Sequence, residues 1–331
     1  MKNNFKILTF ILIINIFVSF NTNSNEVFNF DVTEGEIISD GNIFLGKKGG
    51  TATAEDGTTI TANNFKYNKL LNTLYAEGNV KINDVINDVQ IFTDDITYQK
   101  NDEFIFTKNR TKATDGITTI VGNQFSYKKK LNIINAQGDV VINDTQKDYI
   151  IKAENITYEK KSEKIYTKGI TEALVHSKYK FTSFDVLLLK NEMKLISNNK
   201  STVKDDNFTF YKLDKFSYLI NEELLKGKNI ITITNYLKPK SDKIFFKSGI
   251  FNFSKKKFFS KDTEILLHKT LFDSERFVDS DLTDENKKKA EKFKGQNDPR
   301  ILGVSSSGNE NKTIINKGVF TSCKKNDNCS P

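Results

Sequence analysis

The chain contains no tryptophan, three prolines and two histidines among its 331 residues. The two histidines, His176 and His268, do not form a pair with metal-ligand spacing. The sequence also has no nucleophile elbow and no glycine-rich phosphate loop. We therefore expect a protein that is not an enzyme, with no catalytic residue, no metal ion and no cofactor.

Long apolar runs are also missing, with one exception at the N-terminus. Lys2 and Lys6 precede an apolar stretch from Ile7 to Phe20, and small residues up to Ser24 follow it. This pattern predicts a secretory signal peptide over residues 1–24, and an uncleaved anchor is the alternative. No cysteine stands directly after the run, which argues against a lipoprotein. We expect an exported chain, in which disulfides are allowed.

Basic residues outnumber acidic ones, 50 to 42, and nearly all of them are lysine. A basic face is able to meet anionic lipid headgroups or phosphates. Solvated outer sheet faces and a general abundance of lysine, asparagine and isoleucine explain the excess as well, and we favour that explanation. A nucleic-acid partner is not expected for an exported protein.

An internal repeat is the main feature that the sequence does contain. In Ile60-x-Ala62-x-x-Phe65-x-Tyr67, an apolar and a small residue precede two spacers and a second apolar pair. Further copies begin at Ile91, Ile120, Ile151, Phe181, Tyr211 and Phe246, and their last residues are 29 to 35 positions apart. A period of this size is typical of an elongated array and not of a compact enzyme domain.

Each repeat predicts strands that turn corners. Alternation of period two is the strand signal, but the two halves of the phrase have opposite parity. A bulge or corner at the spacers restores the apolar residues to one side, so we predict corners at Asn63, Asp94, Asn123 and Glu154. Eleven residues beyond each terminal apolar residue stands a Gly or Asn suited to a left-handed second corner: Gly78, Asn109, Gly138, Gly169, Asn199 and Asn229.

Stacked units of this kind predict an all-β fold over residues 27–272. Strand, corner, strand and hairpin repeat to form an elongated antiparallel β-jellyroll, or V-shaped array, of two sheets that share a folded edge. Both sheets direct their apolar residues into the space between them. The residues expected to line that interior are Ile60, Phe65, Tyr67, Ile96, Tyr98, Phe125, Tyr127, Ile156, Tyr158, Phe216, Tyr218, Phe251 and Phe253.

The character of the chain changes after the array. Residues 273–312 are predicted to be a charged flexible linker, with a short exposed helix as an alternative for its first part. The Gly- and Ser-rich stretch Gly303–Asn309 lies inside this linker. A short strand from Thr313 to Phe320 then leads, within residues 313–331, to Cys323 and Cys329.

The repeats resemble a known family. Gly57–Asn68, with Tyr75–Ile82 after it, is similar to the core phrase of the OstA-like domain shared by the lipopolysaccharide transport proteins LptA, LptC and LptD, and Ile134–Ile142 repeats the second part. The tail Asn316–Cys323 is similar to the aromatic-Thr-Ser/Thr-Cys motif of LptD. In that family a tryptophan and a membrane barrel follow, and neither occurs in this sequence.

The resemblance implies a function without chemistry. Lipopolysaccharide acyl chains would be carried in the apolar groove between the sheets, in the periplasm at the outer membrane. The implied partners are other OstA-like proteins, joined by edge-strand addition, and an outer-membrane barrel with its lipoprotein plug. The chain would be an LptD periplasmic region without its barrel, as a truncated product, an incomplete sequence or half of a split protein.

Several alternatives stay open. A free-standing LptA-type bridge is one, and a structural or adhesin repeat protein is another; a β-helix polysaccharide lyase is more distant. The family's cysteine partners are absent, so Cys323 is free to bond to Cys329 or to another chain. From the residues alone, the inward aromatic side chains are a packed core; the resemblance favours a lipid groove.

Overall fold

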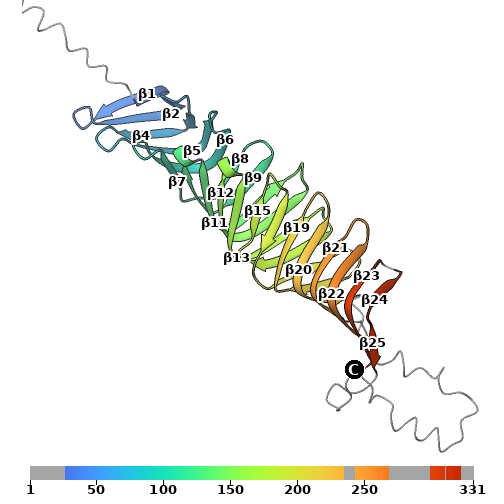
Figure 1. Cartoon of the computed structure of the whole chain (residues 1–331). Helices are drawn as coiled ribbons and strands as arrows, with labels where there is room; N and C mark the ends of the chain where they lie inside the picture. Colours follow the sequence, from blue (N-terminus) through green and yellow to red (C-terminus); the bar gives the residue numbers. More distant parts are fainter. Residues whose placement is uncertain (1–26, 235–242, 268–298, 310, 322–331) are drawn as a thin grey trace, which may run out of the picture.

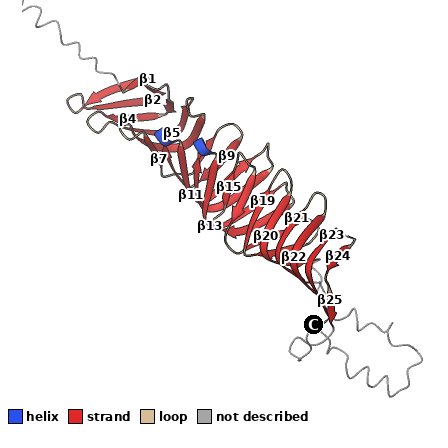
Figure 2. Ribbon diagram, viewed as in Figure 1, coloured by secondary structure: helices blue, strands red, loops and turns tan. Residues whose placement is uncertain are grey.

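The computed structural model describes residues 27–234, 243–267, 299–309 and 311–321. These residues form 25 strands of one antiparallel sheet, with two short 3-10 turns at Lys129–Leu131 and Lys160–Ser162. No α-helix occurs in these ranges, and Figure 2 shows strands along the whole length of the molecule. The predicted all-β, elongated antiparallel fold is therefore confirmed (Figure 1).

The first twelve strands are β1 (Phe28–Ile38), β2 (Ile43–Ala54), β3 (Thr59–Ala62), β4 (Asn64–Asn68), β5 (Thr73–Asp84), β6 (Val89–Gln99), β7 (Phe104–Thr107), β8 (Thr111–Thr114), β9 (Thr118–Gly122), β10 (Gln124–Lys128), β11 (Ile133–Asp144) and β12 (Tyr149–Glu159). The others are β13 (Lys164–Val175), β14 (Tyr179–Phe184), β15 (Leu187–Leu189), β16 (Lys194–Ser197), β17 (Ser201–Lys204), β18 (Phe210–Leu213), β19 (Lys215–Leu219), β20 (Leu224–Ile233), β21 (Lys243–Asn252), β22 (Lys257–Leu266), β23 (Arg300–Asn309), β24 (Thr313–Asn316) and β25 (Val319–Thr321).

The sheet folds at the predicted corners. Asn63 and Asn123 fill one-residue gaps between strands, and Asp94 and Glu154 lie where the ladders of β6 and β12 lose register. Across each register shift, two residues of one strand face one residue of the next, which is the geometry of a bulge. Figure 1 shows the bent strands stacked side by side along the rod.

The second set of corners needs a correction. Gly78, Gly138, Gly169 and Asn229 have the expected positive φ, between 49° and 88°. Asn109 and Asn199 do not adopt it; they lie in the gaps between β7 and β8 and between β16 and β17. The prediction of a left-handed residue was wrong at these two sites, because a break of three residues between strands turns the chain without one.

The corners divide the sheet into two limbs. We call limb A the half-strands that begin with residues 34–38 and 43–47 and continue through β4, β7, β10, β15, β16 and β19; limb B begins with residues 28–32 and 50–54 and continues through β3, β8, β9, β14, β17 and β18. Each long strand contributes half to each limb. Hairpin turns of both limbs lie at the edge opposite the corners.

The parity prediction is confirmed within one repeat. Ile60 and Ala62 in β3 are buried, and so are Phe65 and Tyr67 in β4, after the corner at Asn63. Without the extra residue, the second pair would face solvent. The corner therefore keeps one apolar face continuous from limb B to limb A.

The tail is more ordered than the sequence indicated. Gly303–Asn309, expected to be part of a flexible linker, belongs to β23, which pairs with β22 along its length. Gly- and Ser-rich composition indicated flexibility, but the free edge of β22 offers unpaired backbone groups. Ser306 is fully buried and is within hydrogen-bonding distance of Ser260 and Thr263, at 2.6 and 2.8 Å.

The strand predicted at Thr313–Phe320 occurs as β24 and β25, interrupted at Lys317. Three other predictions fall outside the described residues: the signal peptide, the charged segment 273–298, and the cysteines Cys323 and Cys329.

Candidate functional site

The interior between the limbs brings the predicted residues together. Twelve of the thirteen are at most 7% exposed, and Phe253 is partly buried against the same cluster. Burial raises the pKa of the inward tyrosines, and for Tyr98 the Glu103 carboxylate raises it further. The hydroxyl groups of Tyr67, Tyr98, Tyr127 and Tyr158 are therefore neutral, and they donate hydrogen bonds at the margin of an apolar interior.

Aromatic contacts are concentrated at the N-terminal end and in the C-terminal half of this interior. Near the N-terminus, the ring of Phe28 lies 5.3 Å from that of Tyr67 and 5.6 Å from that of Tyr98. In the C-terminal half, the ring of Phe181 lies 5.4 Å from that of Phe216. Aliphatic residues fill the middle, among them Ile82, Ile91, Ile120, Ile142 and Ile151.

Sequence reasoning missed the aromatic residues before the first repeat copy. Phe28 is buried, and Phe30 and Phe44 pack against the interior with ring centroids 4.4 Å apart. The alternation Phe28-x-Phe30-x-Val32 was the signal that could have found them. They extend the apolar face to the first strand.

In this conformation the limbs are packed against each other. The inward side chains are buried by one another, so the middle of the interior is a core and not an open channel. Hollows of about 450 and 540 Å³ lie instead on outward residues, such as Ile250 and Phe184. The groove expected from the resemblance is thus occupied by the protein's own side chains.

Lysine side chains bridge the edge where the limbs would otherwise separate. Lys129, in a limb A turn, donates hydrogen bonds of 2.6 Å to Asp56 and to the Thr58 hydroxyl in a limb B turn. Its side chain is only 3% exposed, and Asp84 and Glu103 add carboxylate oxygens at 3.8 and 3.6 Å. Partial burial alone would raise the pKa of Asp56, but hydrogen bonds from Lys129 and Thr58 hold it at about 2.

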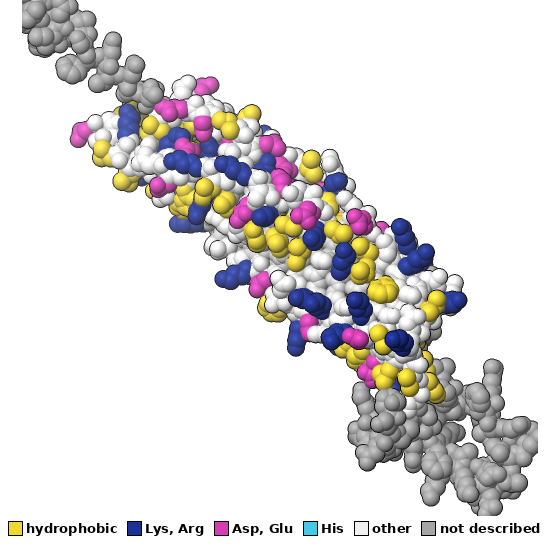
Figure 3. All heavy atoms as spheres, in the orientation of Figure 1, with side chains coloured by type: hydrophobic (Ala, Val, Ile, Leu, Met, Phe, Trp, Pro, Cys, Tyr) yellow, Lys and Arg dark blue, Asp and Glu magenta, His cyan; other side chains and the backbone are white. Residues whose placement is uncertain are grey.

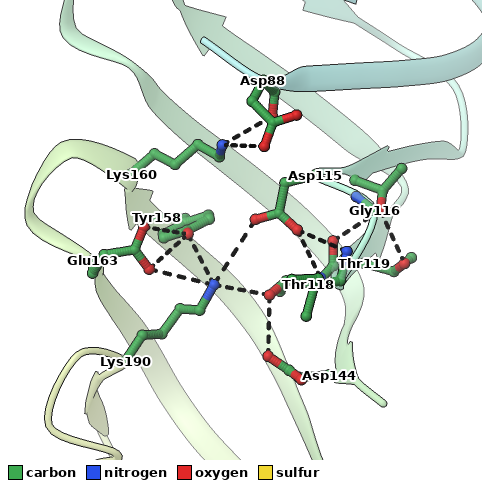
Figure 4. A network of polar contacts seen from close by, with 12 residues as sticks. Asp88, Asp115, Gly116, Thr118, Thr119, Asp144, Tyr158, Lys160, Glu163 and Lys190 are labelled. Carbon is green, nitrogen blue, oxygen red and sulfur yellow. Dashed lines mark hydrogen bonds and ion pairs between the residues drawn. The ribbon is translucent and has the colours of Figure 1, made fainter. Parts of the chain in front are cut away.

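The next two turns repeat the contact. Lys160 donates to the backbone carbonyls of Asn87 and Asp88, at 3.0 and 2.9 Å. Lys190 donates to the Thr118 hydroxyl at 2.8 Å and lies 3.9 Å from Asp115 (Figure 4). We call Lys129, Lys160 and Lys190 the lysine bridge; each spans 72 or 73 residues of sequence.

The lysine bridge ends after Lys190. Ile220 and Phe253 take the same turn position in the next two limb A turns, as their backbone hydrogen bonds to the preceding turn show. There Tyr179 donates to Glu223 at 2.7 Å instead. The sequence signal was a lysine at the first turn residue of five consecutive copies, from Lys69 to Lys190.

The N-terminal end of the interior is less covered. Ile37 has the inward parity of limb A, opposite Phe44, yet it is 65% exposed. Phe30, Val32 and Phe44 are only partly buried. We call these four residues the N-terminal mouth, because apolar inner surface reaches solvent there.

Other kinds of site are not found in the part of the chain that the structure describes. No group of three or more His, Cys, Asp or Glu side chains there is placed to hold a metal ion. Over the same residues, no helix is long and apolar enough to cross a membrane. The sequence matches no model of a known protein family and no curated protein.

Proposed function

We propose that this chain is an OstA-like lipid-carrying module that binds the acyl chains of lipopolysaccharide between its limbs. The observation that carries the proposal is the single apolar face, continuous over the repeats and reaching solvent at the N-terminal mouth. The module performs no chemical step. It acts in the periplasm at the outer membrane, where the N-terminal apolar run would direct it.

Lipid entry requires the packed limbs to part. Each methylene moved out of water stabilises the complex by about 0.8 kcal/mol, so about two to four acyl carbons offset the exposure of one large apolar side chain. The N-terminal mouth is the natural entrance, because no lysine of the bridge closes that end. Lateral entry in the middle would have to break the hydrogen bonds of the lysine bridge.

End-to-end partners follow from the free edges. In the described residues, β1 pairs only with β2, and β24 and β25 pair only with β23, so backbone groups at both ends lack a neighbour. Another OstA-like protein adding a strand there would satisfy them. An outer-membrane barrel with its lipoprotein plug is the further partner proposed on the C-terminal side.

Site-specific photocrosslinking tests the lipid. Photoreactive residues at the inward positions Tyr127, Tyr158 and Tyr218 should crosslink to lipopolysaccharide, and those at the outward Lys128 and Thr157 should not. Equal labelling of both sets, or of neither, in cells that transport lipopolysaccharide would rule out carriage between the limbs. A photoreactive residue at Phe30 or Val32 tests strand addition in the same cells.

A structural repeat protein is the second candidate, favoured by the packed interior and the lysine bridge. The two candidates differ in the effect of a charge inside. If the limbs part for lipid, Phe216→Asp should reduce lipid capture more than it reduces folding; in a permanent core it should unfold the protein, because an unpaired carboxylate next to hydrocarbon is costly.

A further inference from the structure

Four neighbouring strands carry an unusual set of side chains on the outer face of limb A. On β19 to β22, one cross-strand row reads Ser217, Lys226, Ile250 and Phe259, and the next reads Lys215, Lys228, Ser248 and Lys261. We call these eight residues the basic outer patch. They surround a shallow hollow of about 450 Å³ whose lining contains four lysines and no carboxylate.

The lysines of the patch have no countercharge among the residues that the structure describes. Among the described residues, Lys215, Lys226, Lys228 and Lys261 have no ion pair. The carboxylates next in sequence to Lys215 and Lys261 are engaged elsewhere: Asp214 accepts a hydrogen bond of 2.6 Å from Asn229, and Asp262 lies 3.9 Å from Lys247.

Two lysines of the patch even oppose each other. Lys215 and Lys228 are direct cross-strand partners on the same face. Like charges at such positions destabilise a sheet, and exposure to solvent alone does not offset that destabilisation. An anionic partner would offset it by supplying the missing countercharge.

Large apolar side chains lie among the lysines. Ile250 is 41% exposed and Phe259 is 47% exposed, and they are direct cross-strand neighbours. Four strands at a spacing of about 4.8 Å make a nearly flat array about 15 Å across. Flat basic surfaces with protruding apolar residues are suited to a bilayer, where ammonium groups meet lipid phosphates and apolar groups enter the headgroup layer.

The distribution of charge along the rod also favours contact between its C-terminal half and an anionic surface. From Lys243 to Leu266, β21, β22 and their turn carry six lysines and two carboxylates. From Phe28 to Ala54, the β1–β2 hairpin carries four carboxylates and two lysines, and Lys47 and Lys48 pair with Glu36 and Glu34. Dark blue predominates over the C-terminal half of the face shown in Figure 3. An anionic surface would attract the C-terminal half and repel the N-terminal hairpin.

We propose that the basic outer patch binds the anionic headgroups of a lipid bilayer and holds limb A against the membrane surface. This binding is separate from lipid carriage between the limbs and does not depend on it. The N-terminal mouth would then be the end directed away from the bilayer.

The absence of tryptophan allows a direct test with the full chain. A single tryptophan introduced as Phe259→Trp should shift its emission to the blue with vesicles of phosphatidylcholine containing about a third of phosphatidylglycerol, and not with phosphatidylcholine alone. Tyr75→Trp is the matched control: Tyr75 is 44% exposed and also lies outward on limb A, but the lysines around it are accompanied by the carboxylates of Glu77 and Asp95. Its emission should not change.

Charge removal gives the quantitative test. Changing Lys215, Lys226, Lys228 and Lys261 together to glutamine should weaken binding to the anionic vesicles at least about 50-fold, since one lysine near such a surface is worth about fivefold in affinity. The control changes Lys66, Lys108, Lys128 and Lys152, exposed lysines of the N-terminal half, to glutamine. It should alter the affinity for the vesicles only a few-fold. Residues 1–26 are identical in every variant, so any contribution of the N-terminal apolar run is the same in each measurement.

Three results would overturn the proposal. Equal weakening by both sets would mean that net charge alone attracts the vesicles. If the patch variant bound the vesicles as tightly as the wild type does, vesicle binding would belong to another part of the chain, such as the N-terminal apolar run. Lysine-dependent self-association without vesicle binding would make the acidic hairpin of a second copy the true occupant.

Discussion

At the scale of single residues, two tyrosines at the same repeat position meet different surroundings. The Tyr127 hydroxyl donates to Asp84 at 2.8 Å, while the buried Tyr218 hydroxyl has no hydrogen-bond partner in the described part of the chain. Tyr127→Phe should lower the free energy of unfolding by about 1–2 kcal/mol, whereas Tyr218→Phe should leave it unchanged or raise it by up to about 1 kcal/mol. Urea denaturation measures both, and an equal loss in the two variants would contradict the assignment.

A second residue-scale prediction concerns acid. The pKa of Asp56 is about 2 in the folded chain, against an ordinary value of 3.8. Its stabilising contribution is therefore complete above about pH 4 and is lost as the pH falls toward 2, because the unfolded chain takes up the proton first. Between these values, wild type should lose about 1 kcal/mol more stability than Asp56→Asn, allowing for solvent screening of a partly exposed pair. Thermal unfolding at both pH values tests this; parallel losses would refute it.

At the scale of elements, the lysine bridge determines how firmly the limbs are held together. Lys129→Met would leave the buried Asp84 and its neighbour Asp56 without their countercharge, while Glu103 would keep that of Lys100, and should cost about 3–5 kcal/mol of stability. Lys69→Met is the matched control, since Lys69 takes the same turn position but is exposed, and it should change stability by less than about 0.5 kcal/mol. Similar values for both variants in urea denaturation would show that the bridge does not hold the edge.

At the scale of the whole molecule, each rung contacts mainly its neighbours, so stability should vary along the rod. Amide hydrogen exchange should be slowest in β11 to β13, whose turns lie at the lysine bridge, and fastest in residues 34–38 of β1 and in β24, where side chains are exposed. Mass spectrometry of peptide fragments resolves these segments. Uniform protection would mean that the rod opens only as a unit, which would also disfavour lipid entry at the N-terminal mouth.

The sequence by itself determined the strands, the corners and the inward residues, because these follow from a period of two and from one extra residue per corner. Asn63, Phe65 and Tyr67 lie where that short-range pattern predicts. The prediction that Gly303–Asn309 belongs to a flexible linker was wrong, because the order of this segment comes from pairing with β22 and not from its own composition.

Only the tertiary structure decided how closely the limbs pack and which turns meet across the edge. Lys129 reaches Asp56 over 73 residues, about two and a half repeats, and no local pattern encodes that offset. It results from the bend at every corner and the twist added by every strand, accumulated over the stack, and the packing of the facing side chains then settles it.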